Sequence, residues 1–139
     1  MKLPVLSGWA EEWWRRVTGW TAPSTGAKGQ RAEAAAARYL RRQGYRLLGQ
    51  NVRRRYGEMD ILALHQGWLV VVEVRSRGAG SPPPHATLSR DKRRRLRRLA
   101  QNLHREQRFR DLPVRIDLVE VTIDERGRPA SFEIYQAAC

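Results

Sequence analysis

Cysteine and long apolar runs are what this chain most clearly lacks. Among its 139 residues the single cysteine is Cys139, the last residue. One cysteine excludes an internal disulfide and a metal site built from several cysteines. No apolar run approaches the roughly 20 residues that a membrane-spanning helix requires, and Glu11 and Glu12 stand where a signal peptide would have its apolar centre. We therefore expect a cytoplasmic protein without a membrane span.

Lysine and acidic residues are also scarce. The chain has 27 Lys+Arg against 14 Asp+Glu, a formal net charge of +13, and its only lysines are Lys2, Lys28 and Lys92. Such an excess of positive charge indicates a polyanionic partner, and nucleic acid is the first candidate. Arginine also binds phosphate groups in a bidentate manner, which lysine cannot do. The alternative is that the arginine excess reflects composition bias alone.

The first 26 residues differ from the rest of the chain. Apolar residues recur there at helical spacing with charged residues between them, which predicts a short amphipathic helix followed by a linker. That helix can cover apolar surface of the domain, contact a partner or a second copy of the chain, or lie on a membrane surface. Its apolar residues are Trp9, Trp13, Val17 and Trp20. Residues 27–139 are long enough for one domain with a core of ordinary size.

Residues 56–75 predict two apolar strands joined by a tight two-residue turn at Gln66 and Gly67. With that loop His65 pairs with Trp68, and counting outward along both strands places Asp60 opposite Glu73. A three-residue loop would put the two acids on opposite faces of the hairpin, unless a bulge restored the pairing. Two facing carboxylates repel each other unless a cation lies between them. The hairpin therefore predicts a metal site, and the alternative is a half-buried hairpin whose acids are solvated.

The same register places Glu58 opposite Arg75 on the polar face of the hairpin, because side chains alternate along a strand. The other face is then wholly apolar and must pack against the rest of the domain. It is expected to contain Met59, Ile61, Ala63, Val70, Val72 and Val74.

Two helices are predicted to flank the hairpin in the chain. Residues 28–43 form an alanine-rich helix on whose inward side Glu33 lies, either as a salt-bridged residue or as a third acid of the metal site. The second helix begins at the N-cap Ser89 and ends near residue 107. Lys92 extends its apolar stripe towards the sheet, and that stripe consists of Leu96, Leu99, Ala100 and Leu103.

Arginine-rich segments lie next to the proposed site. They are either solvated surface or contacts to a phosphate backbone, and the net charge favours the second interpretation. The glycine- and proline-rich stretch 78–84 predicts an irregular loop beside the site. The residues expected to bind nucleic acid are Arg53, Arg54, Arg55, Arg77, Arg93, Arg94 and Arg97.

The predicted order of elements is one helix, three strands, a second helix and two strands. The first strand covers about residues 45–51, and the last two cover about 114–123 and 131–135. Because the second helix can connect parallel strands, this order predicts an α/β fold with a mixed central sheet.

Together these motifs resemble the PD-(D/E)XK nuclease superfamily with its restriction-endonuclease-like α-β-β-β-α-β core. More narrowly, residues 28–123 resemble the small bacterial YraN-like family, which is related to the archaeal Holliday junction resolvases. The residues that carry the narrower resemblance are the helix 29–40 with Glu33, Gly44-Tyr45, Asn51, Gly57-Glu58-Met59-Asp60, Val72-Glu73-Val74-Arg75-Ser76-Arg77, Lys92 and Arg115-Ile116-Asp117. The Trp-rich N-terminus lies outside it.

The resemblance implies a metal-dependent DNA endonuclease, which can act selectively on branched DNA and can work as a homodimer. It implies Mg²⁺ or Mn²⁺ bound by Asp60, Glu73 and the Val74 carbonyl, with Glu33 as a third acid. The superfamily usually has lysine where this chain has Arg75, and arginine is a poor general base because it stays protonated. Three outcomes follow: Arg75 acts as an electrostatic clamp, Lys92 replaces the missing amine, or the site binds DNA without cutting it.

The motifs leave two further classes of function open. One is a non-catalytic nucleic-acid-binding protein in which the acids remain without a catalytic role. The other is a protein-interaction module that uses the Trp-rich helix. A phosphate-binding protein should lose affinity steeply as the salt concentration rises, which an interaction module should not.

Overall fold

The two helices form where the sequence predicts them. The computed structural model describes residues 27–78 and 88–139, in which α2 spans Ala27–Arg42 and α3 spans Arg90–Arg105. Gly44, with φ 89°, follows α2 in the left-handed conformation that ends many helices. Ser89 caps α3, since its side chain accepts a hydrogen bond from the Lys92 amide at 3.1 Å. The predicted N-terminal helix and most of the predicted loop 78–84 lie outside the described residues.

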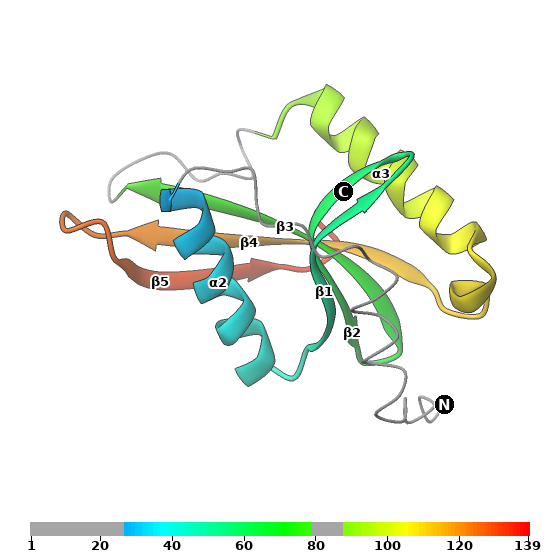
Figure 1. The fold of residues 1–139 in the computed structure, drawn as a ribbon, viewed down its shortest axis with the longest axis horizontal. Helices are drawn as coiled ribbons and strands as arrows, with labels where there is room; N and C mark the ends of the chain where they lie inside the picture. The colour runs from blue at the N-terminus through cyan, green and yellow to red at the C-terminus, as the bar shows by residue number, and fades with distance from the viewer. Residues whose placement is uncertain (1–26, 79–87) are drawn as a thin grey trace.

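Five strands form one sheet in the order β1-β2-β3-β4-β5 (Figure 1). Their bounds are β1 Arg46–Arg54, β2 Gly57–His65, β3 Trp68–Gly78, β4 Val114–Ile123 and β5 Pro129–Tyr135. A short 3₁₀ helix, η2, covers Gln107–Phe109. Only β3 and β4 pair in parallel, and α3 connects them. The mixed α/β sheet with two helices is therefore confirmed.

The turn between β2 and β3 has the predicted geometry. Gln66 and Gly67 have φ angles of 48° and 86°, as a two-residue type I′ turn requires. Consecutive pairs run from His65 opposite Trp68 to Ile61 opposite Val72, so the predicted register is confirmed along this ladder. The ladder ends there, so the predicted pairing of Asp60 with Glu73 across the hairpin is not formed.

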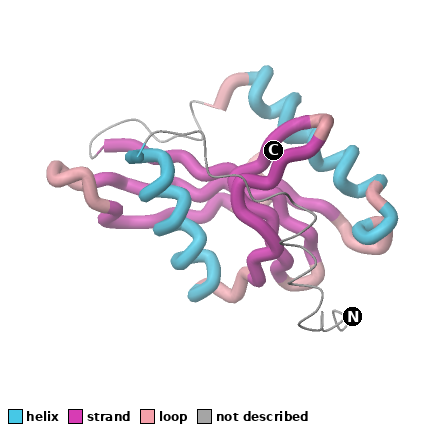
Figure 2. The backbone as a smooth tube through the Cα atoms, in the orientation of Figure 1, coloured by secondary structure: helices cyan, strands magenta, loops and turns pink. Residues whose placement is uncertain are grey.

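Helices cover the sheet on two sides, as Figure 2 shows. Beneath α2 the core contains alternate residues of the central strands, including Ile61, Val70 and Val72. Beneath α3 it contains the intervening residues, including Leu69 and Val71. This alternation follows from the strand period of two.

Met59 departs from the predicted apolar face. It packs beneath α3 with its β1 partner Val52, whereas Ile61, two residues further along the same strand, packs beneath α2. Residues two apart normally share a face. The exchange of faces coincides with Asn51 in β1, which has a φ of 51° and stands between Gln50 and Val52. The left-handed residue breaks the alternation, so the far end of the β1–β2 hairpin faces α3.

At the other end of the sheet a buried acid organises a polar network. Asp117 is fully buried, and its carboxylate accepts hydrogen bonds from the Tyr45 hydroxyl and the Arg115 guanidinium at 2.8 Å and from the Ala137 amide at 3.0 Å. The His65 ring stacks on Tyr45 and lies 2.9 Å from Arg115. Burial and the charge of Arg115 lower the pKa of His65, which favours a neutral imidazole that accepts from the guanidinium. The network ties β2, β4 and the segment after β5 together.

No helix within residues 27–78 and 88–139 is long and apolar enough to cross a membrane.

Candidate metal and nucleic-acid site

The candidate site lies where β2 separates from β3. Beyond the pair Ile61 and Val72 the two strands are no longer paired, and the Asp60 carboxylate accepts a hydrogen bond from the Val74 amide at 2.8 Å. An acidic side chain thus takes the place of a backbone partner at the point of separation. The structure shows this contact to the Val74 amide, and the role of the Val74 carbonyl as a metal ligand stays a prediction.

Glu58 does not face Arg75, contrary to the prediction. It pairs with Arg53 of β1, and the two side chains form an exposed ion pair with Nε and Oε1 3.4 Å apart. The physical reason is the early end of the β2–β3 ladder, which leaves the first residues of β2 paired with β1 alone. Arg75 instead lies 3.6 Å from the Glu73 carboxylate on its own strand.

Three acids influence one another at the site. Glu33 of α2 and Glu73 of β3 are buried, with 8% and 6% of their surface exposed. Burial, followed by the charge of Glu73, raises the pKa of Asp60 to about 7, and Glu33 adds to the rise. Burial also raises the pKa of Glu33, with a smaller contribution from Glu73. Negative charge in this region is therefore costly without a compensating cation.

Two basic side chains already supply positive charge to the acids. The Lys92 ammonium lies 3.0 Å from Oε1 of Glu73, and the Arg75 guanidinium approaches the same oxygen. Lys92 reaches the sheet because it lies one helical turn before Leu96, which is buried on the side of α3 that packs against the sheet. The expectation that Lys92 extends the apolar stripe towards the sheet is thus confirmed.

The acids suit a hard divalent cation by their chemistry, because carboxylate oxygens are the ligands that Mg²⁺ and Mn²⁺ prefer. Their mutual elevation of pKa fits a cation as well. Within the described part of the chain, however, no three His, Cys, Asp or Glu side chains converge closely enough to hold a metal ion. The residues thus fit a cation held chiefly by Asp60 and Glu73, with Glu33, whose charge acts more weakly on Asp60, as the third acid.

The arginines expected to bind nucleic acid fall into two groups. Arg54 donates to Glu106 at 2.9 Å, and Arg77 pairs with the buried Glu120. Acids therefore neutralise both of these guanidinium groups. The second group lies on the outer surface. Its exposed members are Arg53, which pairs with Glu58, and Arg55, Arg94 and Arg97, whereas Arg93 is half-buried. Along α3 they are accompanied by the exposed Arg90, Arg95, Arg98 and Arg105.

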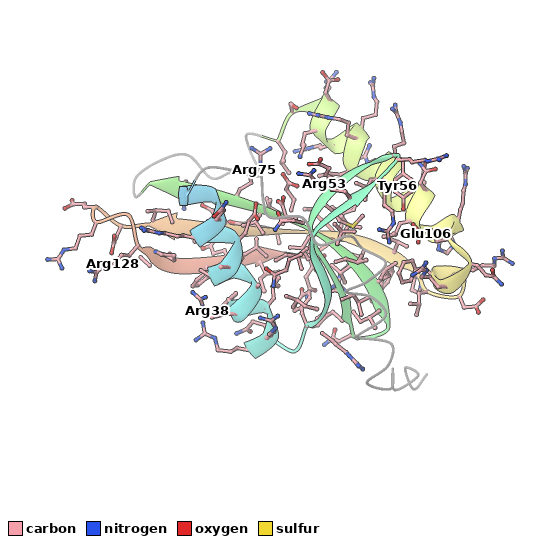
Figure 3. The ribbon with its side chains drawn as sticks, in the orientation of Figure 1. Arg38, Arg53, Tyr56, Arg75, Glu106 and Arg128 are labelled. Atoms are coloured by element: carbon pink, nitrogen blue, oxygen red, sulfur yellow. The ribbon has the colours of Figure 1, made fainter. Side chains whose placement is uncertain are left out.

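Glu106 holds the hairpin against the end of α3. Besides Arg54, the Tyr56 hydroxyl donates to it at 2.6 Å, and Arg108 lies 3.8 Å away. In Figure 3, Arg53 and Tyr56 lie at the end of the hairpin and Glu106 near the end of α3. The sequence analysis missed Glu106, since an acid just after a helix carries no signal for a partner 50 residues earlier.

The two arginine-rich segments consequently form neighbouring parts of one surface. Gly57 allows the close approach, because a Cβ on it would lie 3.1 Å from the Leu99 side chain of α3. Its φ of 147° is also one that residues with a side chain rarely adopt.

Comparison with known proteins identifies relatives over most of the chain. A family model described as "Uncharacterised protein family UPF0102" matches residues 32–121, which include Glu33, Asp60, Glu73 and Lys92. A UPF0102 protein of Clavibacter michiganensis is 41% identical over 112 residues, covering 80% of this chain and 94% of the relative. One of Rhodococcus opacus is 41% identical over 74% of this chain and 88% of its own. One of Persephonella marina is 38% identical over 68% of this chain and 82% of its own. The chain therefore belongs to the uncharacterised protein family UPF0102, the YraN-like family that its motifs resemble.

Proposed function

We propose that this protein is a metal-dependent endonuclease that hydrolyses phosphodiester bonds in DNA, with a preference for branched structures. The observation that carries the proposal is the acid cluster at the separation of β2 and β3. There Asp60 has a pKa raised to about 7 by burial and by Glu73. A carboxyl group in such surroundings is a candidate for function, since folding alone gives no reason to bury like charges together.

The roles of the side chains follow from their chemistry. Asp60 and Glu73 would hold Mg²⁺ or Mn²⁺, with the Val74 carbonyl and Glu33 completing the set. When bound, the cation supplies an acidified water and stabilises the charge that develops on the scissile phosphate. Arg75, 41% exposed and close to Glu73, can donate to that phosphate but cannot accept a proton.

Lys92 is the remaining candidate for a proton-transfer role. Its side chain is 27% exposed and its ammonium lies 3.0 Å from Glu73, which supports a role beside the acids. In this proposal Lys92 orients the attacking water, and Arg75 stabilises the phosphate.

The basic surface supports a DNA substrate. Arginines along α3 and at the end of the β1–β2 hairpin lie on two elements that adjoin the acid cluster, and Arg38 and Arg128 in Figure 3 add positive charge elsewhere. Phosphate contacts of this kind position a duplex without reading its sequence. A four-way junction presents two strands for cutting, so the proposal includes a homodimer that offers two sites.

A non-catalytic nucleic-acid-binding protein is the second candidate. The Lys92–Glu73 ion pair favours it, because this pair already satisfies one of the two principal acids without a metal. The absence of a three-ligand group within residues 27–78 and 88–139 points in the same direction. In that case the basic surface would bind DNA and the acids would serve only the fold.

Cleavage of labelled four-way junction, flap and linear duplex DNA distinguishes the two candidates. The wild type would be compared with Asp60→Ala and Glu73→Ala in Mg²⁺ and in Mn²⁺. Glu125→Ala is the matched control, since it removes one exposed carboxylate from the turn between β4 and β5. The nuclease requires cutting that both site variants abolish and the control retains. Binding without cutting, equal in all four proteins, would leave the DNA-binding protein.

A further inference from the structure

Asn51 has a backbone conformation that a strand does not require. It lies inside β1, yet its φ is 51°. The other non-glycine residues with positive φ in the described part of the chain are Gln66, in the hairpin turn, and Ala137, after the last strand. Asparagine tolerates this left-handed region better than most residues, but the conformation is still less favourable than a regular strand. Strain of this kind is found preferentially at functional sites.

The register places Asn51 level with an acid of the candidate site. Gln50 pairs with Ile61 and Val52 pairs with Met59, so the residue between them on β1 stands opposite Asp60 on β2. It is at this level that β2 exchanges the face it turns to the helices, since Met59 packs beneath α3 and Ile61 beneath α2. The unusual backbone therefore coincides with the acid cluster.

The Asn51 side chain contacts a second acid of that cluster. It forms a hydrogen bond to the Glu33 carboxylate, which opposes the rise that burial causes in the pKa of Glu33. An amide that lowers the pKa of a carboxyl group donates its N–H to the charged form. The Oε2 atom of Glu33 is buried and has no hydrogen-bond partner within the described residues. Asn51 thus holds one oxygen of Glu33 and leaves the other available.

We propose that Asn51 is a positioning residue of the acid site: its left-handed backbone turns its side-chain amide to Glu33 and holds that carboxylate beside Asp60 for a divalent cation. The inference rests on the proposed function and extends it to a residue that does not itself contact the metal. This role accounts for the strained backbone of Asn51, because a regular strand would direct the side chain at this position away from Glu33.

Asn51→Gly separates the side chain from the backbone. Glycine adopts positive φ without strain, so this variant keeps the course of β1 and removes only the amide. Isothermal titration of the metal-free protein with Mn²⁺, together with the thermal midpoint, would be measured for wild type and variant. Gln66→Gly is the matched control, because it also replaces a polar residue of positive φ, and Gln66 lies in the turn at the other end of the β2–β3 ladder.

The expected result is a Mn²⁺ affinity about tenfold weaker in Asn51→Gly, which is the size of effect that partners of metal ligands usually have. The thermal midpoint of this variant should not fall. The Mn²⁺ affinity of Gln66→Gly should equal that of the wild type. An Asn51→Gly protein that binds Mn²⁺ as the wild type does would overturn the inference while the nuclease could still stand. A wild type that binds Mn²⁺ but cuts no DNA, beside a weakened Asn51→Gly, would reject the nuclease and support the inference. A wild type that binds no Mn²⁺ would overturn the inference.

Discussion

Replacing Asp60 by asparagine should stabilise the metal-free protein at neutral and alkaline pH. Asp60 has a pKa near 7 in the folded protein instead of its ordinary 3.8, because it is buried and lies near Glu73 and Glu33. Between these two pH values the folded protein holds a proton that the unfolded chain has released. Folding stability must therefore fall as the pH rises through this window. Asparagine resembles the protonated acid and carries no charge at any pH, so the variant should lack this fall.

The size of the effect follows from the same pKa. Each unit of pKa is worth about 1.4 kcal/mol, so a rise from 3.8 to about 7 corresponds to about 4 kcal/mol between pH 4 and pH 8. The stability difference between Asp60→Asn and wild type should grow by up to this amount over that range. His65, whose pKa is lowered, changes stability in the opposite sense, but its contribution cancels in the difference between the two proteins.

Urea unfolding of both metal-free proteins at pH 4.5, 6, 7 and 8 measures this difference directly. Addition of Mn²⁺ at pH 8 should then stabilise the wild type more than the variant, because only the wild type gains by neutralising the Asp60 charge. An Asp60→Asn variant that is less stable than wild type by the same amount at every pH would refute the reasoning. It would mean that Asp60 is already ionised and well paired in the folded protein.

Three other predictions concern the contact between the hairpin and α3, the buried network around Asp117, and the basic surface. Tyr56→Phe removes the hydroxyl that donates to Glu106, so urea unfolding should show a loss of about 1–2 kcal/mol, and an unchanged midpoint would mean that the hairpin is not held there. Asp117→Asn leaves buried partners without their acid, and should cost about 3–5 kcal/mol or prevent folding; a midpoint near that of wild type would contradict the network. Arg97→Ala should reduce the slope of log affinity for DNA against log salt by about 1, whereas Arg54→Ala should leave the slope unchanged because Glu106 already neutralises this arginine. Equal slopes in both variants would contradict the division of the arginines into two groups.

Local patterns in the sequence predicted several elements of the fold correctly. The turn at Gln66 and Gly67 fixes the register of the β2–β3 ladder, because a two-residue loop leaves one arrangement of partners. Ser89 marked the start of α3 for a similar reason, since its side chain accepts a hydrogen bond from the amide three residues later. These interactions span few residues, and a linear pattern can report them.

The mistaken details involve contacts between distant segments. Glu58 was expected to face Arg75, but strand alternation cannot tell where a ladder ends. Met59 was expected beside Ile61, but the pattern does not reveal the left-handed Asn51 on the neighbouring strand. Each of these outcomes depends on a residue in another strand.

The sequence by itself determined the charge of the protein, its helices α2 and α3, and the register of its central hairpin as far as Ile61 and Val72. Only the tertiary structure decided which charges are balanced. Lys92 reaches Glu73 from α3, Glu106 neutralises Arg54, and Asn51 supports Glu33. The physical reason is that the free energy of a charged side chain depends on its burial and on the partners within a few ångströms, and the fold brings those partners from distant parts of the chain.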